Sequence, residues 1–176
     1  NLTREPQTSS VYAPNKDFLD KFPNYQRFDI IKKIPMDVRR IDELEINEVD
    51  FIKIDIQGAE LNALIGGPDI LEKAFGLELE IEFLPMYKNQ PLFGDVCNYL
   101  EKHNLMFNKF LGLAGRALKP LILKNAQTPS QHIWTDAVFI YHVQKIKNLS
   151  NIKLLKLSLL SLLYGSVAVS YTHLRA

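Results

Sequence analysis

The chain has 176 residues, with 21 Lys and Arg against 20 Asp and Glu, and its formal net charge at pH 7 is +1. This length predicts one domain that buries roughly two-thirds of its unfolded surface, and the balanced charge argues against a nucleic-acid or anionic-membrane partner. The lone Cys97 and four histidines without ligand spacing argue against a disulfide framework or structural zinc, and they fit a reducing, cytoplasmic setting.

The first 48 residues predict little regular structure. Residues 1–26 hold three prolines and many polar residues without a sustained period, which predicts a loop with one short helix near 17–21. Two short strand-like runs follow in "FDIIKKIPMDVRRI". "RIDELEINEVD" then predicts a turn of helix with Asp42 as its N-cap and Glu45 as the capping-box partner.

Residues 49–104 alternate between strand and helix patterns. "VDFIKIDI" (49–56) is nearly filled with apolar residues, as in a strand covered on both faces. "GAELNALIGGPDILEKAF" follows at helical spacing, with Gly66, Gly67 and Pro68 as its stop. "GLELEIEFL" (76–84) predicts the next strand and "PLFGDVCNYLEKHN" (91–104) the next helix. This order predicts crossover units and a parallel sheet.

The C-terminal third changes character. "LMFNKFLGL" (105–113) and "TDAVFIYHV" (135–143) predict an antiparallel pair at the sheet edge, joined by a long loop. Residues 154–163, in a leucine-rich tail, predict a helix that covers the domain or an interface, or that lies on a membrane surface. The apolar run is too short for this helix to span a membrane. The final "VSYTHLRA" resembles translated adaptor read-through, so we assign no function to Tyr171 or His173.

Polar residues concentrate where the strand at 49–56 gives way to a helix: Asp55, Gln57, Gly58 and Glu60. Ligands of parallel sheets bind beyond the carboxyl ends of the strands. Gly58 allows backbone and ligand to approach closely, and the helix start directs free N–H groups at the same place. The pattern favours a ligand role for Asp55, and it leaves ligand binding and helix capping equally open for Glu60.

Other candidate residues follow the next strands. Glu82, Tyr87, Lys88 and Asn89 could form a substrate loop or a solvated turn. Arg116 and Lys119 could meet an anionic substrate, although a basic loop in water is the more common arrangement. Trp134 and Tyr141 are more typical of packing than of a stacking platform. No metal site is predicted.

The string "VDFIKIDIQGAELNALIGG" resembles the signature of the FkbM-type S-adenosylmethionine-dependent methyltransferases. Flanking segments extend the resemblance over roughly residues 6–143: "SSVYAPN", "RRIDEL", "GLELEIEFLPMYKNQPLF" and "DAVFIYHV". The resemblance implies a class I methyltransferase fold, a Rossmann-like, doubly wound α/β sheet that is mostly parallel with a terminal antiparallel hairpin. It also implies S-adenosylmethionine near Asp55, Gln57 and Gly58, with Asp55 and Glu60 acting on a hydroxyl of a sugar or other small metabolite.

Two departures from the family limit this expectation. Gln57 stands where many members have Glu, and a neutral amide cannot act as a general base. No glycine precedes Gly58, so the glycine-rich loop and the acidic residue that hold the donor in such enzymes have no match. We therefore expect residues 1–144 to be the C-terminal part of an N-terminally truncated methyltransferase domain, inactive alone, with residues 145–176 as a helical tail.

Two other classes of protein are compatible with parts of the pattern. A degenerate methyltransferase-like binding module would keep the sheet and self-associate through its leucine-rich tail. A nicotinamide dehydrogenase would share only the fold class, because no Gly-x-Gly-x-x-Gly occurs in the chain.

Overall fold

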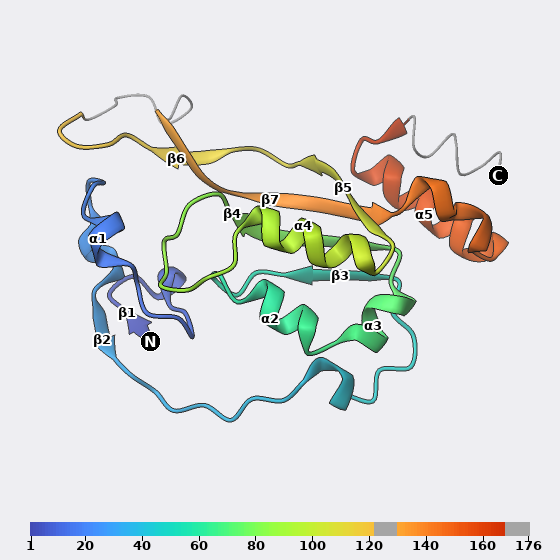
Figure 1. Ribbon diagram of the computed structural model, residues 1–176, viewed down its shortest axis with the longest axis horizontal. Helices are drawn as coiled ribbons and strands as arrows, with labels where there is room; N and C mark the ends of the chain where they lie inside the picture. The colour runs from blue at the N-terminus through green and yellow to red at the C-terminus, as the bar shows by residue number, and fades with distance from the viewer. Residues whose placement is uncertain (122–129, 168–176) are drawn as a thin grey trace.

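The computed structural model describes residues 1–121 and 130–167 (Figure 1). Its main sheet consists of β3 (Phe51–Ile54), β4 (Gly76–Glu82), β5 (Leu105–Phe110), β6 (Ala114–Arg116) and β7 (Gln131–Tyr141). β3 and β4 are parallel, whereas β7 runs antiparallel to β4, β5 and β6. The α/β architecture and a Rossmann-like fold agree with the sequence, and the predicted antiparallel pair forms between β5 and β7. The expectation of a mostly parallel sheet with this pair at its edge is wrong for the described residues, because only β3 and β4 are parallel and β7 lies between β4 and β5.

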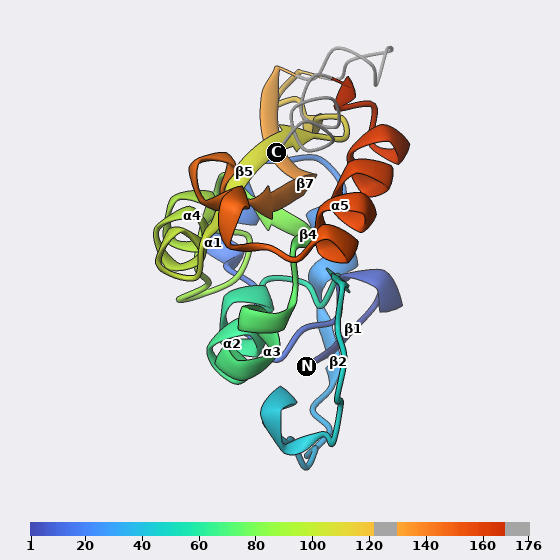
Figure 2. The ribbon, with the colours of Figure 1, turned by 90° about the vertical axis from the view of Figure 1, so that its right-hand side faces the viewer.

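Helices cover both faces of this sheet (Figure 2). α2 (Glu60–Ile65), α3 (Pro68–Lys73) and α4 (Phe93–Lys102) lie on one face, and α5 (Asn151–Leu163) lies on the other. The first face holds the main core, whose buried members include Leu64, Leu71, Leu77, Leu79, Ile81, Leu100 and Phe139. A second core of Phe75, Val138, Ile140 and Leu157 lies beneath α5. Both cores follow from the alternation of side chains along β4 and β7.

β4 carries three acidic residues on the face away from α2, α3 and α4. Leu77, Leu79 and Ile81 enter the main core, so the alternating Glu78, Glu80 and Glu82 point to the other face. Glu78 is neutralised there, because it pairs with Lys53 and accepts a hydrogen bond from Tyr164 Oη at 2.5 Å. Glu80 and Glu82 lie further toward the carboxyl end of the strand.

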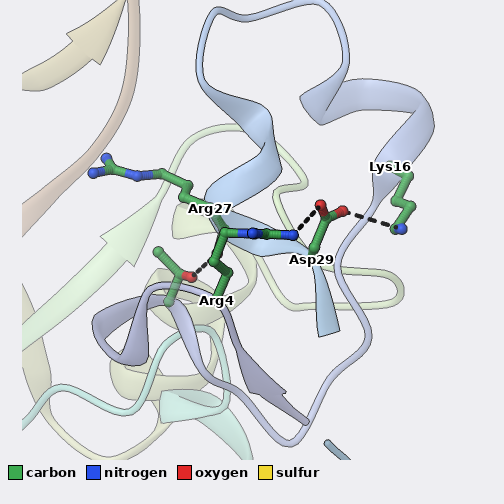
Figure 3. A network of polar contacts seen from close by, with 5 residues as sticks. Arg4, Lys16, Arg27 and Asp29 are labelled. Atoms are coloured by element: carbon green, nitrogen blue, oxygen red, sulfur yellow. Dashed lines mark hydrogen bonds and ion pairs between the residues drawn. The ribbon is translucent and has the colours of Figure 1, made fainter. Parts of the chain in front are cut away.

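The N-terminal segment folds onto that end of the sheet. It contains β1 (Leu2–Thr3), paired with β2 (Ile30–Lys32), and α1 (Lys16–Leu19). Leu19 and Phe22 pack against Met86, Tyr87 and Ile133. Asp29 links two parts of the segment through ion pairs with Arg4 at 3.7 Å and Lys16 at 3.3 Å, while the side chain of Arg27 turns away from them (Figure 3). The segment is thus a wall built against the sheet by apolar packing.

Asp42 caps a helix other than the predicted one. It lies within a single 3-10 turn (Ile41–Glu43), and its carboxylate accepts hydrogen bonds from the N–H groups of Asp69 and Ile70, both at 3.2 Å. These two residues belong to the first turn of α3, whose free N–H groups need acceptors. The predicted capping box of Asp42 with Glu45 is therefore wrong, because the 30–50 segment runs back past α3 (Figure 1).

The strand at 49–56 is shorter and more open than predicted. β3 lies at the edge of the described sheet, the side chain of Lys53 is 57% exposed, and Ile56 is 44% exposed. The expectation that this strand is covered on both faces is wrong for the described residues. The second strand-like run before it forms no strand, and its Met36 and Val38 are exposed.

The leucine-rich tail packs on the sheet through a minority of its leucines. α5 buries Leu157 together with Ser158 and Ser161, whose small side chains let the helix approach the sheet closely. Ile152, Leu155, Leu159 and Leu162 remain exposed. Within residues 1–121 and 130–167, no helix is long and apolar enough to cross a membrane. Tyr171 and His173 lie outside the described residues.

Candidate functional site

The turn after β3 depends on two residues with left-handed backbone conformation. Gln57 has φ 57° and Gly58 has φ 95°. A Cβ atom at Gly58 would lie 3.1 Å from Gln90 Nε2 and 3.3 Å from Tyr87 Cδ2, so the missing side chain also makes room for the loop after β4. Glycine is therefore required here both by conformation and by close packing.

Replacing Gly58 by alanine is expected to lower the free energy of unfolding by about 1–2 kcal/mol, because alanine disfavours this φ value. Gly94 is a matched control, since it lies in α4 and a Cβ atom added there would have no neighbour within 4 Å. Gly94→Ala is expected to leave stability unchanged or raise it by up to about 1 kcal/mol. Denaturant unfolding of the two variants measures both changes, and equal effects would contradict the role of the Gly58 conformation.

The Glu60 carboxylate stabilises this turn through hydrogen bonds to its backbone. Glu60 is the first residue of α2 and is buried, with 3% of its surface exposed. Its Oε1 accepts hydrogen bonds from the N–H groups of Ile56 at 2.8 Å and Gly58 at 3.3 Å. Burial raises the pKa of the Glu60 carboxyl, and these backbone hydrogen bonds oppose the rise. Glu60 thus orders the turn, and its carboxyl is also part of the acidic group described below.

Gln57 connects the carboxyl ends of two neighbouring strands. Its Nε2 donates to Asp55 Oδ1 at 3.1 Å and to Glu80 Oε2, and its Oε1 accepts from Tyr87 Oη at 3.2 Å. Burial, followed by the nearby Asp55 carboxylate, raises the pKa of Glu80 to about 8. Asp55, Glu60 and Glu80 each offer one carboxylate oxygen, and these three oxygens lie within 4.8 Å of one another.

Glu82 lies behind this group. Only 2% of its surface is exposed, and Oε1 has no hydrogen-bond partner among the described residues. Burial and then the carboxylates of Glu60 and Glu80 raise the pKa of Glu82 to about 9. Asp55, Glu60 and Glu80 thus form a close acidic group, and the buried Glu82 carboxyl on the same face of β4 is affected by its charge.

A cavity of about 850 Å³ opens between the N-terminal segment and the carboxyl ends of the strands. Asp55, Gln57 and Glu80 line its acidic end. Arg27, Arg116 and Trp134 line another part of it, and the Arg116 guanidinium lies 4.8 Å from the centre of the Trp134 ring. Apolar side chains complete the wall: Phe18, Leu19, Phe22, Tyr25, Phe28, Met86 and Ile133. A polar end and an apolar wall suit a small organic ligand.

The structure does not bring every predicted substrate residue to this cavity. Tyr87 is fully buried, and its Oη also donates to the carbonyl of Thr8 at 2.9 Å, which ties the N-terminal segment to the turn. Lys88 and Asn89 are exposed and do not line the cavity. Lys119 lies over the Tyr25 ring and pairs with Asp20, also outside the lining.

Glu80 and Gln90 were not singled out from the sequence. The strict alternation of β4 could have indicated Glu80, because it places this residue on the same face as Glu82. Gln90 gave no such signal. It is buried, its Oε1 accepts from the Tyr87 N–H at 2.5 Å, and its Nε2 has no partner among the described residues.

An acid-lined cavity beyond the carboxyl ends of β3 and β4 is the usual place for a ligand in such a sheet. A sequence profile of the Methyltransferase FkbM domain matches residues 4–105, from the N-terminal wall of the cavity to the start of β5. The chain belongs to the FkbM methyltransferase family. Comparison with curated proteins and with solved structures gave no match, so the assignment rests on this domain.

Membership of the FkbM family implies a methyl donor and a small-molecule substrate. Asp55 and Gln57 fit one end of a donor, since they lie at the strand-to-helix turn and open on the cavity. Residues 1–57 contain no glycine, and a glycine-rich loop that would surround the rest of the donor has no counterpart there. The chain's residues therefore fit only part of this cofactor.

Proposed function

We propose that the chain is part of an S-adenosylmethionine-dependent methyltransferase that methylates a hydroxyl group of a sugar or other small metabolite. The observation that supports this proposal is the position of Asp55. This residue follows β3 within the matched family domain and, beside Glu80, lines the cavity of about 850 Å³. Because the residues before Gly58 offer no donor loop, we further propose that the chain alone is inactive and that the donor is held with residues of a longer protein.

The chain's own residues would act on the acceptor. A donor of this class supplies an electrophilic methyl group, so the protein must orient an acceptor oxygen and receive its proton. The Asp55 carboxylate, at the open edge of the acidic group, is placed to accept that proton. Gln57 holds Asp55 and Glu80 side by side, which fixes the direction of their oxygens. The neutral amide of Gln57 positions these groups without exchanging a proton.

The wall of the cavity would bind the body of the acceptor. Phe28 and Trp134 offer aromatic faces, and the Arg116 guanidinium, which lies over Trp134 and lines the cavity, brings a positive charge to a polar substituent. A sugar or small metabolite with both an apolar face and hydroxyl groups matches this mixture.

Calorimetric titration with S-adenosylmethionine tests the proposal. The longer reading frame would be expressed beside the 176-residue chain and both titrated under the same conditions. Binding by the longer protein and none by this chain is the expected result. A folded longer protein that fails to bind would contradict the proposed cofactor.

A second candidate function is a methyltransferase-like binding module that associates through its tail. The exposed residues Ile152, Leu155, Leu159 and Leu162 on α5 favour it. This candidate would lead if the longer protein is folded, binds no donor and self-associates.

A further inference from the structure

We propose that Asp55, Glu60 and Glu80 form a binding site for one hard divalent cation such as Mg²⁺, Mn²⁺ or Ca²⁺, at the acidic end of the cavity. The inference adds a metal that neither the sequence nor the family match assigns. It concerns binding by the chain itself and does not depend on the methyltransferase proposal.

The three carboxylates lie close enough together to share one ion. They come from three elements, the end of β3, the first turn of α2, and β4, yet one oxygen of each lies within 4.8 Å of the others. Ligand distances of about 2.0–2.1 Å for Mg²⁺ and 2.3–2.6 Å for Ca²⁺ place oxygens on opposite sides of the ion about 4.0–5.2 Å apart. The three oxygens therefore lie within the span of one coordination sphere, and small side-chain movements would bring all three onto one ion.

The charges of the group are not balanced by the surrounding protein. Within the part of the chain that the structure describes, no Lys or Arg forms an ion pair with Asp55, Glu60, Glu80 or Glu82. Lys53, on the neighbouring strand, pairs with Glu78 instead. Gln57 donates hydrogen bonds to two of the carboxyl groups but brings no charge. A group of acids this close needs protons or a cation.

Glu82 adds a buried carboxyl beside these three acids. It is 98% buried on the same strand face as Glu80, and its Oε1 lacks a hydrogen-bond partner among the described residues. The carboxylates of Glu60, Glu80 and Asp55 raise its pKa, and a contact with the Gln90 amide opposes this rise only in part. A buried, unpartnered carboxyl oxygen is costly, and a cation held by the three acids beside it would offset that cost.

Gln57 can add a fourth oxygen. Its Nε2 lies against Asp55 and Glu80, where the cation would sit, and its Oε1 accepts from Tyr87. If the amide turns over, Oε1 faces the ion and Nε2 donates to Tyr87 Oη, which already donates to Thr8. All the ligands are then oxygens, which suit Mg²⁺, Mn²⁺ or Ca²⁺ better than Zn²⁺.

Mn²⁺ titration of the 176-residue chain, without any methyl donor, tests this site. The electron paramagnetic resonance signal of free Mn²⁺ is expected to fall with one saturable site per chain. Glu80→Gln is expected to weaken binding at least tenfold, and so is Asp55→Asn, which changes an exposed residue and does not threaten folding. Circular dichroism confirms that each variant is folded.

Glu78→Gln is the matched control. This substitution removes the same charge from the same face of β4, but Glu78 pairs with Lys53 and is not one of the three proposed ligands. The affinity of the Glu78→Gln variant for Mn²⁺ should therefore equal that of the unsubstituted chain. The proposal is overturned if the folded chain binds no Mn²⁺ up to about 1 mM, the weak end of known calcium sites. Equal weakening by Glu78→Gln and Glu80→Gln would also overturn it, because binding would then follow net charge alone. Either failure leaves the donor titration above unaffected.

Discussion

Asp55→Asn in the longer, donor-binding protein is expected to reduce kcat by roughly 10²- to 10⁴-fold, the range over which a positioned proton acceptor contributes. Asparagine keeps the shape of the side chain and can still accept the hydrogen bond from Gln57 at the Asp55 position. It cannot accept the acceptor's proton. Donor affinity, measured by calorimetry, should change much less than kcat, because the substitution removes one carboxylate at one end of the site.

Asp50→Asn serves as the control for this prediction. Asp50 directly precedes β3, at the end of the strand opposite the turn, and its carboxylate pairs with Lys156 of α5. Its replacement removes the same charge and should leave kcat near the wild-type value. If Asp55→Asn also leaves kcat near the wild-type value, Asp55 belongs to the turn and not to the chemistry.

The local part of the site could be predicted from the sequence because its determinants are adjacent. The change from strand to helical period at 49–65, with Gly58 at the turn, placed Asp55 at the carboxyl end of a strand and Glu60 at the start of a helix. Both placements depend only on neighbouring residues. The order of strands and helices similarly indicated the α/β sheet.

Contacts between distant segments could not be predicted in the same way. Gln57 joins Glu80, 23 positions away, and Tyr87 Oη reaches the carbonyl of Thr8, 79 positions away. Asp42 similarly caps α3 through contacts 27 and 28 positions away. No periodic pattern encodes such contacts, because they depend on how packed elements meet. The N-terminal segment was therefore predicted as a loop without its role as a cavity wall.

The leucine-rich composition of the tail did not show which of its leucines would be buried. Leucines occur around most of α5, so the sequence allowed several packing faces. The structure buries Leu157 with two serines and leaves more leucines exposed, because the small side chains permit closer approach to Val138 and Ile140. Deleting residues 145–176 to test association would also remove Leu157 from the core beneath α5 and destabilise the domain. Single substitutions separate the two effects.

Leu157→Ala is expected to lower the free energy of unfolding by about 2–5 kcal/mol, the usual cost of truncating a fully buried leucine. Leu157 has no exposed surface and packs with Phe75, Val138 and Ile140 under α5. The loss includes the transfer of the removed methyl groups and the space they leave between helix and sheet. Denaturant unfolding with an unchanged m-value measures it directly.

Leu155→Ala provides the control on the same helix. Leu155 is 47% exposed, so its truncation should change stability by no more than about 0.5 kcal/mol. Light scattering on this variant then reports on association without a change in fold: a mass that falls relative to the unsubstituted chain would place Leu155 in an interface. Equal destabilisation by Leu155→Ala and Leu157→Ala would show instead that α5 packs through a different face, and the core beneath it would have to be reassigned.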